Sequence, residues 1–144
     1  MNVPGLRSCY EKVGGIHYLG RMFDKIRLRA AEKLPEEYHA NLGKGFDARV
    51  LSFLDVDYPS LVQRVKEGGT DEEVLQWCFQ RGYTPDAEEI EIWNEFMRKR
   101  GWNDEGAATL VRRLKEINCE NRTDIQTFFD FIDLDEGRDP REKR

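Results

Sequence analysis

The chain has 144 residues, of which 39% are hydrophobic and 35% charged, and its 23 basic and 28 acidic side chains give a net charge of −5. This length and aromatic content are typical of one globular domain with its own core, and they exclude a disordered tail. No apolar run approaches the roughly 20 residues that a membrane-spanning helix needs, and the first residues lack the pattern of a signal peptide. We therefore expect no membrane association.

Positive charge is concentrated at the N-terminus. Residues 1–34 contain seven basic and three acidic side chains, a net charge of +4, whereas residues 35–144 carry −9. Such a segment either binds an anion or an acidic protein partner, or pairs with the acidic remainder of the same fold. We expect internal pairing, because oppositely charged faces of one small domain usually meet. The net negative charge makes nucleic-acid binding unlikely.

The three cysteines are few and widely separated. Cys9, Cys78 and Cys119 form no C-x-x-C motif, so they indicate neither a disulfide framework nor a zinc site. Cys78, between Trp77 and Phe79, is expected to be a small core residue. The pattern favours a reduced, cytoplasmic protein.

The first predicted helix follows Gly14-Gly15 and ends near Leu34-Pro35, since a residue that precedes proline is disfavoured in the α conformation. Its apolar residues recur at spacings of three and four, which is typical of an amphipathic helix. They are Ile16, Leu19, Phe23, Ile26 and Ala30. Residues 36–45 show no such period and are predicted to form a loop.

The remaining helices are predicted from start and stop signals. They cover 46–54, 57–67, 70–81, 84–100 and 103–117, with a last helix from 123 onward. Thr70 and Thr123 each begin a sequence typical of a capping box, Pro59 lies in a first turn, and Asn103 is a predicted cap. No strand pair or hairpin is indicated. The predicted fold is all-α, a single compact helical bundle of six or seven helices over 1–138, followed by a charged, frayed tail over 139–144.

The polar face of the first helix is a candidate binding surface. If its apolar stripe faces the core, then His17, Arg21, Asp24 and Lys25 share another face. Arg21 and Lys25 lie one turn apart and repel each other unless an anion lies between them, whether a protein carboxylate or a bound ligand. The alternative is a solvated face with a surface pair between Arg21 and Asp24, which would contribute little.

The segment after this helix supplies further candidates. His39 beside Tyr38 and Glu37 is a candidate general acid or base, although a histidine in a loop can equally bond a backbone carbonyl or water. Lys44 lies between two glycines and is a candidate residue for binding an anion, although this segment does not have the spacing of a P-loop. A pocket between residues 17–25 and 36–47 would thus bind a ligand through Arg21, Asp24, Lys25, Tyr38 and Lys44, with His39 as the catalytic candidate.

No metal or cofactor site is predicted. The chain has no H-E-x-x-H motif, and the acidic residues over 130–136 do not have the spacing of a calcium loop. We expect this acidic helix end to pair with a basic residue from the N-terminal segment.

Five stretches of the sequence resemble a known family. Residues 19–27 (LGRMFDKIR), 37–39 (EYH) and 41–47 (NLGKGFD), with 71–77 and 128–138, are similar to a group of small bacterial proteins catalogued only as a domain of unknown function. The resemblance implies a cytosolic helical domain and no assigned activity. We therefore expect a non-catalytic binding or regulatory module for an acidic partner or a second copy of itself; the alternative is a small enzyme or anionic-ligand-binding protein.

Overall fold

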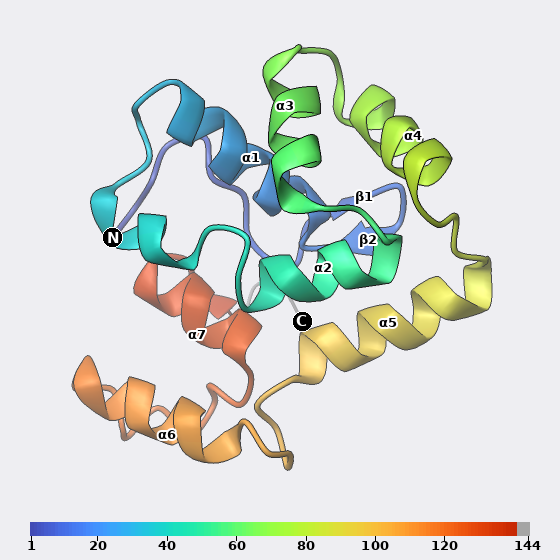
Figure 1. The fold of residues 1–144 in the computed structure, drawn as a ribbon. Coiled ribbons are helices and arrows are strands. Elements are labelled where there is room, and N and C mark those ends of the chain that lie inside the picture. The colour runs from blue at the N-terminus through green and yellow to red at the C-terminus, as the bar shows by residue number, and fades with distance from the viewer. Residues whose placement is uncertain (141–144) are drawn as a thin grey trace.

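The computed structural model describes residues 1–140, and across these residues the fold is mostly helical, as predicted. It has seven α-helices, one 3₁₀-helix and one two-stranded hairpin (Figure 1). In chain order they are β1 (Lys12–Val13), β2 (Ile16–His17), α1 (Leu19–Ala30), η1 (Glu36–Asn41), α2 (Phe46–Leu54), α3 (Tyr58–Lys66), α4 (Asp71–Arg81), α5 (Ala87–Lys99), α6 (Ala107–Glu116) and α7 (Phe128–Asp135). Most of the tail for which fraying is predicted, 141–144, lies outside the described residues.

The prediction of no strands is wrong at the start of the chain. Lys12 pairs with His17 and Val13 with Ile16 in an antiparallel hairpin. The turn is Gly14-Gly15, where both residues have positive φ, as a tight hairpin turn requires. Ile16 therefore belongs to a strand, and α1 begins only at Leu19. An apolar residue at position 16 fits a buried strand as well as the first turn of a helix, so the apolar periodicity could not distinguish the two there.

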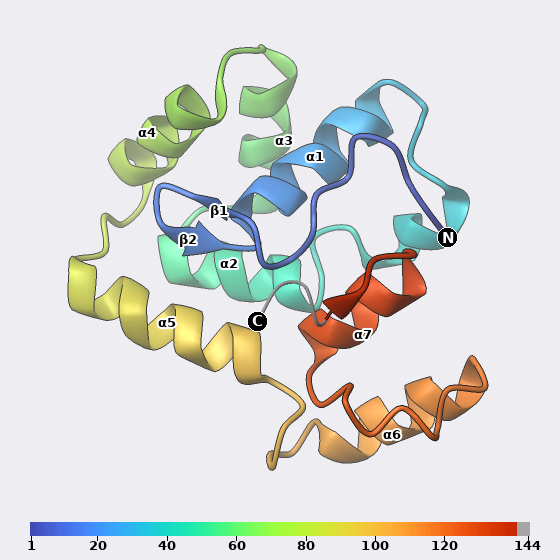
Figure 2. The same ribbon diagram turned by 180° about the vertical axis from the view of Figure 1, so that it is seen from behind.

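Helix α1 lies inside the molecule instead of on its surface. All eight residues of 19–26 are buried, the charged ones included. The hairpin and α3 both contact this helix, and the chain before the hairpin runs beside it in both views (Figures 1 and 2). The prediction of an amphipathic helix with one solvated face is therefore wrong for its first two turns.

The helix ends follow the predicted caps in part. Thr70 and Glu73 form the predicted capping box of α4, and Asp57 caps α3 just before Pro59. Three predicted starts lie too early in the sequence: α5 begins at Ala87, after its Asp86 cap, α6 begins at Ala107, not after Asn103, and α7 begins at Phe128. Thr127 caps α7 by accepting a hydrogen bond from the Asp130 amide, so a second Thr with the same local pattern provides the cap.

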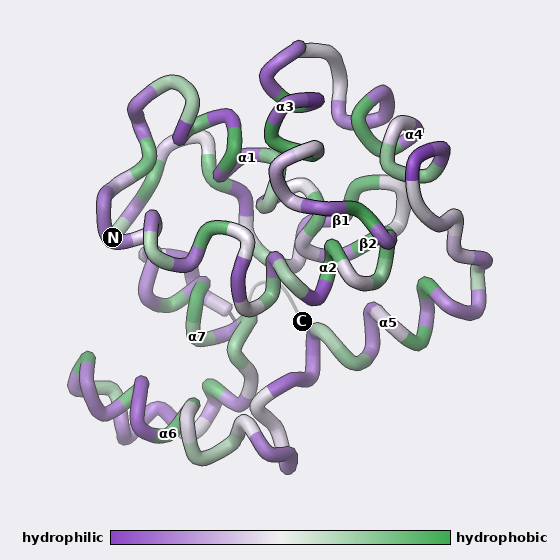
Figure 3. The backbone as a smooth tube through the Cα atoms, viewed as in Figure 1, coloured by the Kyte–Doolittle hydropathy of each residue, from purple (hydrophilic) through white to green (hydrophobic). Residues whose placement is uncertain are grey.

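Two apolar clusters hold the fold together. The larger one contains α1 with residues from the hairpin and from α2 to α5, together with Phe129 of α7. The smaller one joins α6 to α7 through Leu110, Leu114, Ile125 and Phe131. Helix α6 lies at one edge of the molecule in both ribbon views. Hydrophobic and hydrophilic residues alternate along it and along α5 (Figure 3).

Candidate functional site

Arg21 forms a buried ion pair with Glu136, which follows α7. Its two terminal nitrogens donate to the two carboxylate oxygens at 2.8 and 2.6 Å, in a bidentate arrangement. The side chains are only 4% and 3% exposed. This pair confirms that the acidic end of the last helix meets a basic residue of the N-terminal segment.

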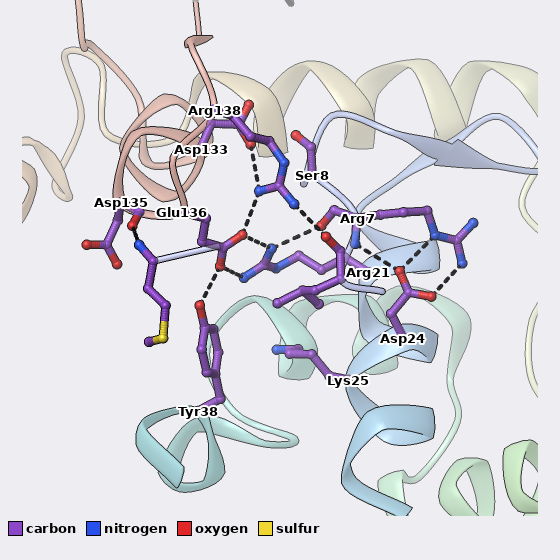
Figure 4. Close-up of polar contacts among 12 residues, drawn as sticks. Arg7, Ser8, Arg21, Asp24, Lys25, Tyr38, Asp133, Asp135, Glu136 and Arg138 are labelled. Atoms are coloured by element: carbon purple, nitrogen blue, oxygen red, sulfur yellow. Dashed lines mark hydrogen bonds and ion pairs between the residues drawn. The ribbon is translucent and has the colours of Figure 1, made fainter. Parts of the chain in front are cut away.

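Glu136 also joins two other parts of the chain. Arg138 donates to its Oε1 at 2.6 Å, and the Tyr38 hydroxyl donates to its Oε2 at 2.8 Å (Figure 4). Burial by itself raises the pKa of Glu136, but the hydrogen bonds and charge of Arg21, with those of Arg138 and Tyr38, outweigh burial and lower it. Glu136 is therefore an ionised centre that connects α1, η1 and the C-terminal segment.

Lys25 has a separate buried partner, Asp47 of α2. Its ammonium group donates to Asp47 at 2.7 Å and to the Tyr18 hydroxyl at 3.0 Å. Tyr18 in turn donates to Asp47 at 2.8 Å, and the Gly43 amide donates to the other carboxylate oxygen at 2.9 Å. Burial and the Asp47 charge raise the pKa of Tyr18, so its phenol stays protonated.

Asp24 faces a third group of charges. It accepts hydrogen bonds from the Arg7 side chain at 2.9 and 3.0 Å and from the Arg7 amide. Arg7 and Arg27 each also pair with Asp71, at 2.8 Å. The expectation of internal pairing is confirmed for Arg7, Arg21, Lys25 and Arg27, and the alternative surface pair between Arg21 and Asp24 is not formed. The other basic residues of the segment, Lys12, Arg29 and Lys33, are exposed and have no ion pair within residues 1–140.

A cavity of about 560 Å³ lies between α1, η1, the start of α2, α6 and α7. Aromatic residues of η1, α2 and α7, with the residue just before α1, supply its apolar wall: Tyr38, Phe46, Phe128, Phe131 and Tyr18. The Phe46 ring meets the Tyr18, Phe128 and Phe129 rings edge to face at 5.6 to 6.2 Å. Tyr18, Phe46 and Phe128 thus form a connected set of rings in this wall, which suits a flat or apolar ligand.

Basic residues outnumber acidic ones around this cavity. The basic residues are Arg21, Lys25, Lys44, Arg49, Arg100 and Arg113, and the acidic residues are Glu37, Asp135 and Glu136. Arg21 and Lys25 have buried partners, and Arg100 pairs with Asp104 at 3.4 Å.

Three of these basic side chains keep their charge available. Lys44, Arg49 and Arg113 are exposed, and none of them has an ion pair within residues 1–140. Arg49 lies over the Phe96 ring, 5.1 Å from its centroid, and Arg100 lies over the same ring at 5.9 Å. The acids without an ion pair in the same range, Glu37 and Asp135, come from η1 and α7.

Four of the predicted ligand-binding residues line this one cavity, namely Arg21, Lys25, Tyr38 and Lys44. The structure places Asp24 on Arg7 and His39 outside the lining. His39 Nε2 lies 2.9 Å from the Leu34 carbonyl oxygen, the alternative considered for it. Arg21 and His39 therefore do not converge on a concave site, as catalysis by His39 would require.

The sequence did not indicate several residues of the cavity. Arg49, Arg113 and Phe128 come from α2, α6 and α7 and lie outside the two segments predicted to form a pocket. The signals for this region in the sequence are Arg21 and Lys25 of the first helix, Tyr38, and the Gly-Lys-Gly segment before α2.

Other chemistry has little support in the described part of the chain. Within residues 1–140, no group of three or more His, Cys, Asp or Glu is placed to hold a metal ion. Cys9, Cys78 and Cys119 are free thiols, and burial raises the pKa of Cys9 to about 12. None of the helices of these residues is long and apolar enough to cross a membrane.

Comparison with known proteins identifies the family without adding an activity. No curated protein matches the chain. The model of a family described as "Domain of unknown function (DUF5069)" matches residues 3–138, nearly the whole chain. The resemblance seen in the sequence thus corresponds to a defined family, and the chain belongs to it.

Proposed function

We propose that this protein is a non-catalytic binding module that holds a small organic anion in the cavity between α1, η1, α2, α6 and α7. The observation that carries the proposal is local positive charge on an acidic protein. Lys44, Arg49 and Arg113 surround an aromatic-walled cavity, although the chain as a whole has a net charge of −5. Unpaired cations at an apolar cavity favour a ligand with an anionic group and a flat or apolar body.

Binding explains this site better than catalysis does. The cavity residues that the structure describes include no His, Cys or Ser, and Tyr18 and Tyr38 both have raised pKa values, mainly because of burial. A nucleophile with an adjacent base, which acyl-transfer chemistry needs, is not assembled there. The basic N-terminal segment gives less support to an acidic protein partner, because four of its seven basic side chains, Arg7, Arg21, Lys25 and Arg27, are paired internally. Self-association stays a prediction. We place the protein in the cytoplasm on the basis of its free thiols.

Two probes of the same shape and opposite charge test this function. Benzoate is expected to raise the melting temperature, and benzylammonium is not. A ligand at 100 times its Kd adds about 2.7 kcal/mol, which corresponds to roughly 9 °C for a domain of this size. Arg49→Ala is expected to weaken benzoate binding, whereas Lys66→Ala, an exposed lysine on α3, serves as the matched control. Equal shifts from both probes, or from neither, would refute the proposal.

A further inference from the structure

Helix α5 has two large apolar side chains on its outer face. Ile92 and Phe96 are 64% and 44% exposed, and within residues 1–140 they are the one pair of exposed large apolar residues that share a helix. Because they lie four residues apart, they are neighbours on one face. The opposite face is anchored, since Met97 is buried and Asn94 accepts a hydrogen bond from a hairpin amide at 3.0 Å. Helix α5 lies along the outside of the molecule in both ribbon views (Figures 1 and 2).

The charge on this face changes sign from one end of α5 to the other. Glu88, in the first turn, is exposed and has no ion pair in the described range 1–140. Lys99, in the last turn, is 50% exposed, and its ion pair within the helix joins two exposed groups and contributes little. Arg49 and Arg100 lie over the Phe96 ring and add positive charge at the same end. Because Glu88 and Lys99 are about three helical turns apart, both lie on the face of the apolar pair.

Such a face is complementary to itself. A two-fold axis between Ile92 and Phe96 would place two copies of α5 antiparallel, with Ile92 of each copy against Phe96 of the other. The same rotation brings Glu88 beside Lys99 of the second copy, because the midpoint of 88 and 99 nearly coincides with that of 92 and 96. A partner of a single charge would match only one end of this face, whereas a second copy matches both.

We propose that the outer face of α5, formed by Glu88, Ile92, Phe96 and Lys99, binds a second copy of the chain in an antiparallel, two-fold dimer. The symmetry repeats each contact, so the dimer has two apolar contacts and two ion pairs. Apolar burial supplies the affinity, and the charges fix the antiparallel orientation. One helix from each copy makes a small interface, so we expect a weak and reversible dimer.

Sedimentation velocity of the full chain, from micromolar to millimolar concentration, tests the proposal. Wild type is expected to change from monomer to dimer as the concentration rises. Ile92→Glu is expected to weaken the dimer at least about tenfold, because both copies contribute this side chain to the apolar contact. Val111→Glu is the matched control, because Val111 is also 64% exposed but lies on α6.

Charge reversal tests the antiparallel register. Glu88→Lys and Lys99→Glu are each expected to weaken the dimer roughly fivefold or more, because each variant turns both attractive pairs into repulsive ones. An equimolar mixture of the two variants is expected to associate more tightly than either variant alone. In the mixed dimer, each Lys again faces a Glu of the other copy.

Three results would overturn the proposal. The first is a wild-type protein that remains monomeric at millimolar concentration. The second is a dimer that Ile92→Glu weakens no more than Val111→Glu does, because the contact then lies elsewhere or reflects general surface charge. The third is a mixture of the charge variants that gains nothing over each variant alone, which refutes the antiparallel pairing. Circular dichroism of each variant confirms that the helical fold is retained.

Discussion

Glu136→Gln removes the negative charge that accepts hydrogen bonds from three side chains. Arg21, only 4% exposed, would keep its charge and lose its carboxylate, while Arg138 and Tyr38 would each lose an ionised acceptor. Removing one partner of a buried ion pair costs about 3–5 kcal/mol, because the other charge is left buried and uncompensated. For 144 residues this corresponds to a decrease in melting temperature of about 10–15 °C. Chemical denaturation gives the free energy of unfolding directly.

Two further variants make this prediction specific. Glu95→Gln removes an ion pair with Arg98 whose side chains are more than 40% exposed, and it is expected to cost about 0–1 kcal/mol. The double variant Arg21→Met/Glu136→Leu removes both buried charges and is expected to be less destabilised than Glu136→Gln. If Glu136→Gln lowers the free energy of unfolding no more than Glu95→Gln does, the buried ion pair does not contribute to stability.

The same residue gives a dependence on pH. The pKa of Glu136 is lower in the folded protein than its ordinary value of 4.5, so its contribution is present above pH 4.5 and is lost as the pH falls through the folded value. Wild type is therefore expected to lose stability in this acidic range more steeply than Glu136→Gln. Parallel curves for the two proteins between pH 6 and pH 3, about the range of carboxylate titration, would contradict this.

Three other regions give independent predictions. Burial is the main reason that the pKa of His17 is lowered in the folded protein. The unfolded chain therefore binds more protons, and the free energy of unfolding falls as the pH decreases below about 6.5. In pH-dependent denaturation, His17→Gln should reduce this loss, and His39→Gln serves as the comparison. Gly82→Ala would place a Cβ 2.0 Å from the Leu54 carbonyl oxygen, and the backbone shift should cost roughly 1–3 kcal/mol or more; an unchanged melting temperature would show that the α2–α3 connection yields freely. The Cys9 thiol is fully buried and its pKa is raised to about 12, so it should react with a thiol reagent only when the protein unfolds. Rapid labelling of Cys9 in the native protein, located by mass spectrometry, would contradict this burial.

Local sequence signals determined much of the secondary structure. The capping box at Thr70 and the proline after Asp57 act through side chains within a few residues of the helix start, so their effect is visible without a fold. The sequence predicts the start of α7 too early because Thr123 and Thr127 both fit a cap, and only packing selects Thr127. The Gly14-Gly15 turn is also local, but a helical period in the residues that follow concealed it.

The sequence by itself determined the helical class of the protein and most of its helix positions. It also indicated that the basic N-terminal segment pairs with acidic residues of the same fold. Only the tertiary structure decided which acids these are. Glu136 lies 115 residues from Arg21 and Asp47 lies 22 residues from Lys25, and no local pattern encodes such separations. The candidate cavity depends on the same long-range packing. Arg49 and Arg113 have no distinguishing pattern in the sequence, and they line one cavity because α2 and α6 both pack against α7.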